Sequence, residues 1–85
     1  MRVHVFVSGT VQGVWFRQFA KDSADSLGLS GWACNLPDGR VECLAEGDKE
    51  NINKFLKLLK TGSPDSKVEN IEYKEIDGKS FFTIK

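Results

Sequence analysis

The sequence has few of the residues that build a metal centre. It contains one histidine, His4, and two cysteines, Cys34 and Cys43. The cysteines lack the paired short spacings typical of a zinc site, and no ligand partner stands near His4. We therefore expect no metal and no cofactor. Both cysteines fall in one predicted hairpin, so a disulfide is conceivable, but two reduced, partly buried thiols are the expectation.

A net charge and a long apolar run are also missing. Twelve basic side chains balance twelve acidic ones, so no overall field attracts nucleic acid or anionic lipid. The opening MRVHVFV is too short and too alternating for a signal peptide, and the apolar runs fall far below a membrane span. We expect a soluble, cytoplasmic monomer without a nucleic-acid or membrane partner. Its 85 residues allow one domain, 1–85, with a single core.

The hydrophobic pattern predicts a strand, a helix and a hairpin in turn. Residues 3–7 alternate at the period of a strand, and residues 16–27 carry apolar side chains at helical spacing. Gly28 follows where a helix end often needs a left-handed residue. Residues 30–36 and 40–46 predict an antiparallel hairpin, because Pro37-Asp38-Gly39 between them is a turn sequence.

The second half predicts another helix and more strands. Asp48 offers an N-cap, and the helix after it has a buried stripe made by Ile52, Phe55, Leu56 and Leu59. Residues 68–76 predict a long strand. Asp77-Gly78 predicts a turn before a short last strand at residues 81–84, whose placement stays open. Trp32, Phe55 and Leu59 are expected in the core, and His4 is expected to be a half-exposed strand residue.

This order predicts an α+β fold with a ferredoxin-like βαββαβ sandwich. Two helices cover one face of a mostly antiparallel sheet, and a short extra C-terminal strand follows. The first and second strands are joined through a helix and should run parallel. Arg17, after the first strand, and Asn35, at the end of the second, can therefore meet in one cleft.

The first helix begins without a side chain that could cap it. The residues before Phe16 are Gln12, Gly13, Val14 and Trp15, and none of them is a usual N-cap residue. The first backbone amides of the helix therefore lack an acceptor. Arg17 follows in the first turn, where a cation opposes the helix dipole unless an anion sits between them. Gly9 and Gly13 let successive N–H groups of the loop converge. These features predict an oxyanion site, although simple turn geometry and a solvated arginine remain the alternative.

Five segments resemble the acylphosphatase family in order and spacing. They are residues 9–17 (GTVQGVWFR), 28–32 (GLSGW), Asn35, 38–42 (DGRVE) and 46–47 (EG). The resemblance spans nearly the whole chain. It implies a ferredoxin-like fold that hydrolyses small acyl phosphates without a metal, with inorganic phosphate as product and competitive inhibitor.

The resemblance also implies roles for particular residues. Arg17 matches the arginine that binds phosphate, and Asn35 matches the asparagine that positions the attacking water. Two departures from the pattern are Trp15, where a smaller residue is frequent, and Ile84-Lys85, where some members carry an aromatic residue. The phosphate-binding loop comprises Gly9, Val11, Gln12, Gly13, Val14, Trp15 and Phe16.

Two functions of another class remain as alternatives. The same fold carries RNA-binding domains, but the basic and aromatic signature of an RNA reader is weak in residues 40–44. A sensor could also keep the phosphate pocket and bind a metabolite such as carbamoyl phosphate without turnover.

Overall fold

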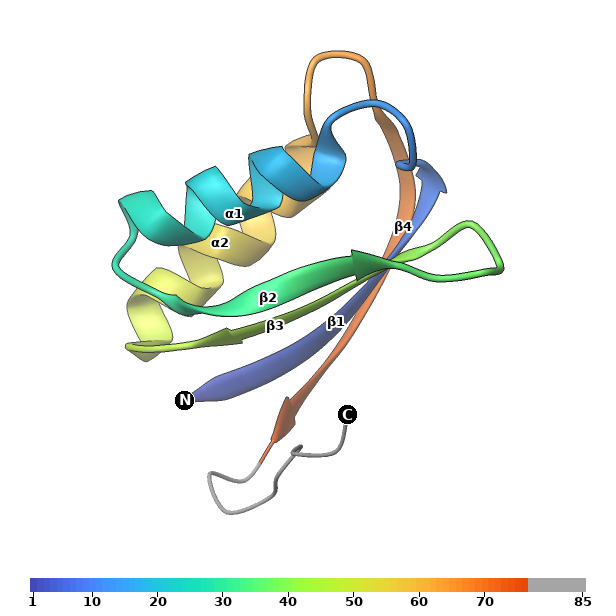
Figure 1. Cartoon of the computed structure of the whole chain (residues 1–85). Coiled ribbons are helices and arrows are strands. Elements are labelled where there is room, and N and C mark those ends of the chain that lie inside the picture. Colours follow the sequence, from blue (N-terminus) through green and yellow to red (C-terminus); the bar gives the residue numbers. More distant parts are fainter. Residues whose placement is uncertain (77–85) are drawn as a thin grey trace.

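Strands and helices follow one another along the chain in the predicted βαββαβ order (Figure 1). The computed structural model describes residues 1–76, so the predicted turn at Asp77-Gly78 and the strand at residues 81–84 lie outside the described residues. The six elements are β1 (Arg2–Thr10), α1 (Phe16–Ser26), β2 (Ser30–Asn35), β3 (Val41–Glu46), α2 (Lys49–Thr61) and β4 (Lys67–Ile76).

The four strands form one sheet in the order β2-β3-β1-β4, and each neighbouring pair is antiparallel. Since β1 and β2 both run antiparallel to β3, they run parallel to each other with β3 between them, as the sequence predicted. Figure 1 shows both helices on the same face of this sheet. The loop that leaves β1 and the end of β2 consequently lie toward the same end of the sheet.

Alternation along the strands builds the core. Val3, Val5 and Val7 of β1 are fully buried, and the residues between them face the side of the sheet that carries no helix. On the helix-covered face, α2 buries Ile52, Phe55 and Leu59 over the sheet, as predicted, whereas Leu56 of the predicted stripe is only partly buried. Burial of such side chains stabilises a fold by roughly 1.5–3 kcal/mol each. This core packs both helices against the sheet.

The prediction that Trp32 belongs to the core is wrong. Its side chain is 41% exposed, because Trp32 pairs with Leu44 on the helix-free face of the edge strand β2. Apolar character alone does not say which face a strand residue takes, and an edge strand leaves even its inward residues partly wet.

The two cysteines lie on opposite faces of the hairpin. Cys43 pairs with Ala33 on the buried face, whereas Cys34 pairs with Glu42 on the helix-free face. They are not joined by a disulfide. Alternate strand residues point to opposite faces, so this register keeps the two sulfur atoms apart and excludes the bridge left open by the sequence.

Candidate active site

The loop after β1 begins with a bulge at glycine. The register between β1 and β4 shifts between Ser8 and Gly9, and Gly9 has a φ of 124°. A Cβ atom at Gly9 would lie 2.2 Å from the carbonyl oxygen of Lys67, so no larger residue fits. Gly13 has a φ of 77° further along the loop. Both glycines therefore shape the loop, as predicted.

Helix α1 starts without a side-chain cap. Trp15 is its N-cap residue, has a left-handed backbone (φ 63°, ψ 20°), and makes no capping hydrogen bond through its side chain. Asp48 does stand at the predicted N-cap of α2, yet its side chain makes no capping hydrogen bond either. The missing side-chain cap is thus not peculiar to α1, and the expected capping of α2 by Asp48 is wrong.

The distinguishing feature of the α1 start is the preceding loop. Among residues 1–76, the backbone N–H groups of residues 12–15 donate no hydrogen bond to a backbone or side-chain acceptor. The loop carbonyls of Val14 and Trp15, by contrast, each accept one, from the Ser63 hydroxyl at 3.0 Å and the Phe19 amide at 3.0 Å. Successive amides without partners, next to a helix N-terminus, form the kind of concavity that binds anions.

Two side chains hold this loop in place. The Gln12 carboxamide donates to the carbonyl oxygens of Leu36 and Arg40, at 2.8 and 2.9 Å. These carbonyls belong to the turn between β2 and β3, so Gln12 ties the loop to the strand end that carries Asn35. Ser63, which is 4% exposed, fixes the opposite side of the loop through Val14. Neither contact was predicted from the sequence.

Arg17 and Asn35 line one pocket of about 800 Å³ between α1 and β2. Gly13, Trp15 and Phe16 of the loop line it as well. Arg17 is the second residue of α1, and Asn35 is the last residue of β2. The tertiary structure thus brings together two residues that stand eighteen positions apart in the sequence.

The side chains of Arg17 and Asn35 are both exposed, and neither makes a hydrogen bond or ion pair with another side chain among residues 1–76. Arg40 differs, because its guanidinium donates to Asp38 at 2.8 Å and stacks over Phe6. The Arg17 guanidinium therefore keeps its donors available to a ligand, and the Asn35 carboxamide offers both a donor and an acceptor.

Charges at the rim of the pocket are largely balanced. Lys21 lies one helical turn after Arg17 and pairs with Asp25 at 2.9 Å, and the hydrogen bond to this carboxylate raises the pKa of Lys21.

Among residues 1–76, no three His, Cys, Asp or Glu side chains gather closely enough to hold a metal ion. No helix within the same residues is long and apolar enough to cross a membrane.

Comparisons of the sequence with known proteins agree on one family. The Acylphosphatase family profile matches residues 3–84. An acylphosphatase of Methylococcus capsulatus is 48% identical, over 96% of this chain and 89% of that protein. One from Trichormus variabilis is 45% identical, over 100% of this chain and 86% of its own length.

A solved structure gives the same result for the fold. The crystal structure of acylphosphatase from Bacillus subtilis superimposes with a TM-score of 0.88 at 43% identity, covering 96% of this chain and 89% of that one. Both the fold and the sequence are therefore shared over almost the full length. The chain belongs to the acylphosphatase family of hydrolases, which act on acyl phosphates.

Proposed function

We propose that the chain hydrolyses the carboxyl–phosphate bond of small acyl phosphates to a carboxylate and inorganic phosphate, without a metal or other cofactor. One observation carries this proposal: Arg17 and Asn35 line the same pocket beside a loop whose amides have no acceptor among residues 1–76. Inorganic phosphate is expected to bind in the same place and to compete with substrate. We expect the protein to act as a monomer, because every proposed group comes from one chain.

Arg17 and the loop amides are proposed to hold the phosphoryl group. The planar guanidinium can donate two parallel hydrogen bonds to two phosphoryl oxygens, and the amides of residues 12–16 can take the remaining oxygen. Arg17 in the first turn opposes the helix dipole, and a bound dianion removes that repulsion. The phosphate site is therefore stabilised by charge and by geometry together.

Asn35 is proposed to position the attacking water. A carboxamide has no useful pKa and cannot act as a base, but it can hold a water through one donor and one acceptor. The carboxylate is a good leaving group, so cleavage of the phosphorus–oxygen bond needs little help from a general acid. The loose transition state depends mainly on positioning of the reactants and on stabilisation of the phosphoryl charge. The water's proton can pass to a phosphoryl oxygen of the substrate.

Three substitutions test these roles. Arg17→Ala should lower kcat/KM for acetyl phosphate on the order of 10³-fold, by analogy with other arginines that stabilise phosphoryl transfer. Arg17→Lys should restore little of this activity, because the compact ammonium group of lysine cannot donate the two parallel hydrogen bonds of the guanidinium. Asn35→Ala should lower kcat while the inhibition constant of inorganic phosphate changes little. Arg40→Ala is a matched control, since Arg40 is paired outside the pocket, and should retain activity.

Three results would contradict parts of the proposed function. If Asn35→Ala lost phosphate binding instead of kcat, the roles of the two residues would be assigned wrongly. EDTA should have no effect, and a loss of activity restored by a divalent cation would contradict the metal-free reaction. Stoichiometric binding of acyl phosphate without turnover would point to a sensor rather than an enzyme.

A further inference from the structure

We propose that the pocket selects acyl phosphates with an aromatic or bulky apolar acyl group, and that Trp15 is the specificity-determining residue. This inference rests on the proposed function, since it names the substrate class of the same site. Four observations carry it: the position of the Trp15 indole, the backbone of Trp15, the size of the pocket and the charge balance at its rim.

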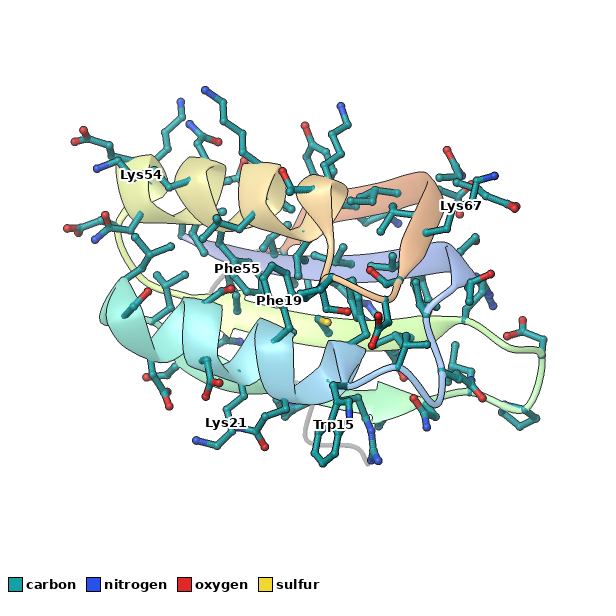
Figure 2. The ribbon with its side chains drawn as sticks, turned by 90° about the horizontal axis from the view of Figure 1, so that it is seen from above. Trp15, Phe19, Lys21, Lys54, Phe55 and Lys67 are labelled. Atoms are coloured by element: carbon teal, nitrogen blue, oxygen red, sulfur yellow. The ribbon has the colours of Figure 1, made fainter. Side chains whose placement is uncertain are left out.

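Trp15 lines the pocket that contains Arg17 and Asn35, whereas the Trp32 side chain lies on the opposite, helix-free face of β2. The Trp15 side chain is 78% exposed, so its indole is not packed in the protein core. Figure 2 shows the Trp15 side chain pointing outward from the start of α1, whereas Phe19 and Phe55 lie inside the molecule. A large aromatic surface left in water beside a polar site suits a ligand with an apolar part.

The backbone of Trp15 makes its exposure harder to explain as packing. Among residues 1–76, Trp15 is the sole residue other than glycine with a positive φ. A bulky side chain disfavours this conformation, by roughly 1–2 kcal/mol relative to the right-handed region, and glycine or asparagine would adopt it more easily. Trp15 thus carries a cost in the folded state without a compensating contribution to the core. Strain of this kind is typical of positions that contact a ligand.

The size of the pocket exceeds what a phosphoryl group and a two-carbon acyl group need. Its volume of about 800 Å³ is in the range of pockets that enclose drug-sized ligands. Beyond Arg17 and Asn35, its lining includes the small side chains Ala20, Ala24 and Ala33 of α1 and β2. The polar side chains Gln18, Lys21 and Asp25 of α1 line it as well. The space continuous with the phosphate site is therefore large and offers apolar contacts.

The in-line geometry of the displacement also favours Trp15 as the residue that contacts the acyl group. In an in-line displacement the attacking water and the leaving oxygen lie on opposite sides of phosphorus. Asn35 holds the water from the β2 side in the proposed function, so the acyl group extends away from Asn35, toward the part of the pocket formed by the loop and α1. Trp15 stands there, at the N-terminus of α1.

Charge at the rim argues against an anionic acyl group. Arg17 is assigned to the phosphoryl group, and the next cation along the same side of α1, Lys21, is paired with Asp25. No surplus positive charge remains on this helix face to recognise a second anion. An uncharged aromatic ring on Trp15 is the occupant that these groups favour.

The test compares benzoyl phosphate with acetyl phosphate in wild type, Trp15→Gly and Trp15→Phe. The quantity measured is the ratio of kcat/KM for benzoyl phosphate to kcat/KM for acetyl phosphate. Any disturbance of the phosphate-binding loop affects both substrates and cancels from this ratio. Trp15→Gly should lower the ratio about threefold to tenfold, the fold-change that an aromatic pair contributes. Trp15→Phe should retain most of it.

Controls separate this inference from the proposed function. Tyr73→Ala removes another exposed aromatic side chain, outside the pocket, and should leave the ratio unchanged. Inhibition by phenylphosphonate relative to methylphosphonate gives the same comparison without turnover. A ratio that stays within about twofold in Trp15→Gly overturns the specificity role while the hydrolase function stands. Wild-type protein that hydrolyses neither substrate overturns the proposed function, and this inference with it.

Discussion

Replacing Gln12 by leucine tests how the phosphate-binding loop is held. The substitution removes two hydrogen bonds, to the carbonyl oxygens of Leu36 and Arg40. Each is worth roughly 0.5–1.5 kcal/mol net. Both carbonyls keep a second donor, because the Gly39 amide bonds to Leu36 and the Leu36 amide bonds to Arg40. The free energy of unfolding should therefore fall by about 1–2 kcal/mol, at the lower end of the possible sum.

The isosteric substitution Gln12→Glu makes the test sharper. An ionised carboxylate has the same shape but only accepts hydrogen bonds, so it would face two carbonyl oxygens at distances of 2.8 and 2.9 Å. Gln12→Glu should consequently cost more stability than Gln12→Leu at neutral pH. Part of the lost stability should be regained at low pH, where the protonated carboxyl group of Gln12→Glu can donate one hydrogen bond.

Urea unfolding followed by tryptophan fluorescence and by circular dichroism measures these free energies. Gln18→Leu is the matched control, since the Gln18 carboxamide donates one exposed hydrogen bond to Asp22, four residues on in the same helix. That pair should contribute about 0.2–0.5 kcal/mol. Equal losses for Gln12→Leu and Gln18→Leu would refute the reasoning, because the carboxamide of Gln12 would then not tether the loop.

Three further predictions concern the loop and the buried thiol. Gly9→Ala should destabilise the protein by at least about 1–3 kcal/mol in thermal unfolding, because a Cβ atom meets the Lys67 carbonyl oxygen and the backbone has a positive φ; an unchanged melting temperature would contradict the close approach. Ser63→Ala should weaken inhibition by inorganic phosphate, because Val14 loses its anchor, and an unaltered inhibition constant would argue against an anchored loop. Burial raises the pKa of Cys43 from 9.0 to about 12. The folded state keeps this thiol protonated while the unfolded chain ionises, so stability is fully present below about pH 9 and declines toward pH 12; Cys43→Ala should flatten that alkaline decline in urea titrations, and an equally steep decline would exclude Cys43 as its source.

Local pattern was sufficient for the elements of this fold. Residues 3–7 alternate with the period of a strand, and α2 has its apolar residues on one stripe, so both elements could be predicted before any contact was known. The parallel relation of β1 and β2 followed from the helix that connects them. It brought Arg17 and Asn35 to one end of the sheet, and the structure has both lining one pocket.

Faces and distances were harder to predict. Trp32 was expected in the core because it is large and apolar, but its place on the edge strand exposes it. The disulfide left open between Cys34 and Cys43 is excluded by a register that puts them on opposite faces. Strand side chains alternate with a period of two, so a one-residue difference in register reverses the face, and register is decided by pairing across the whole sheet.

The sequence by itself determined the order of the elements and the glycines at which the loop bends, and its resemblance to a family pointed to the two residues proposed for catalysis. Only the tertiary structure decided that Gln12 and Ser63 hold the loop from two sides, and that Trp15 stands exposed at the rim of the pocket. The physical reason is the range of each interaction. Turn and helix preferences depend on neighbours along the chain, whereas a hydrogen bond from residue 12 to residue 36 exists only once the core has brought both segments together.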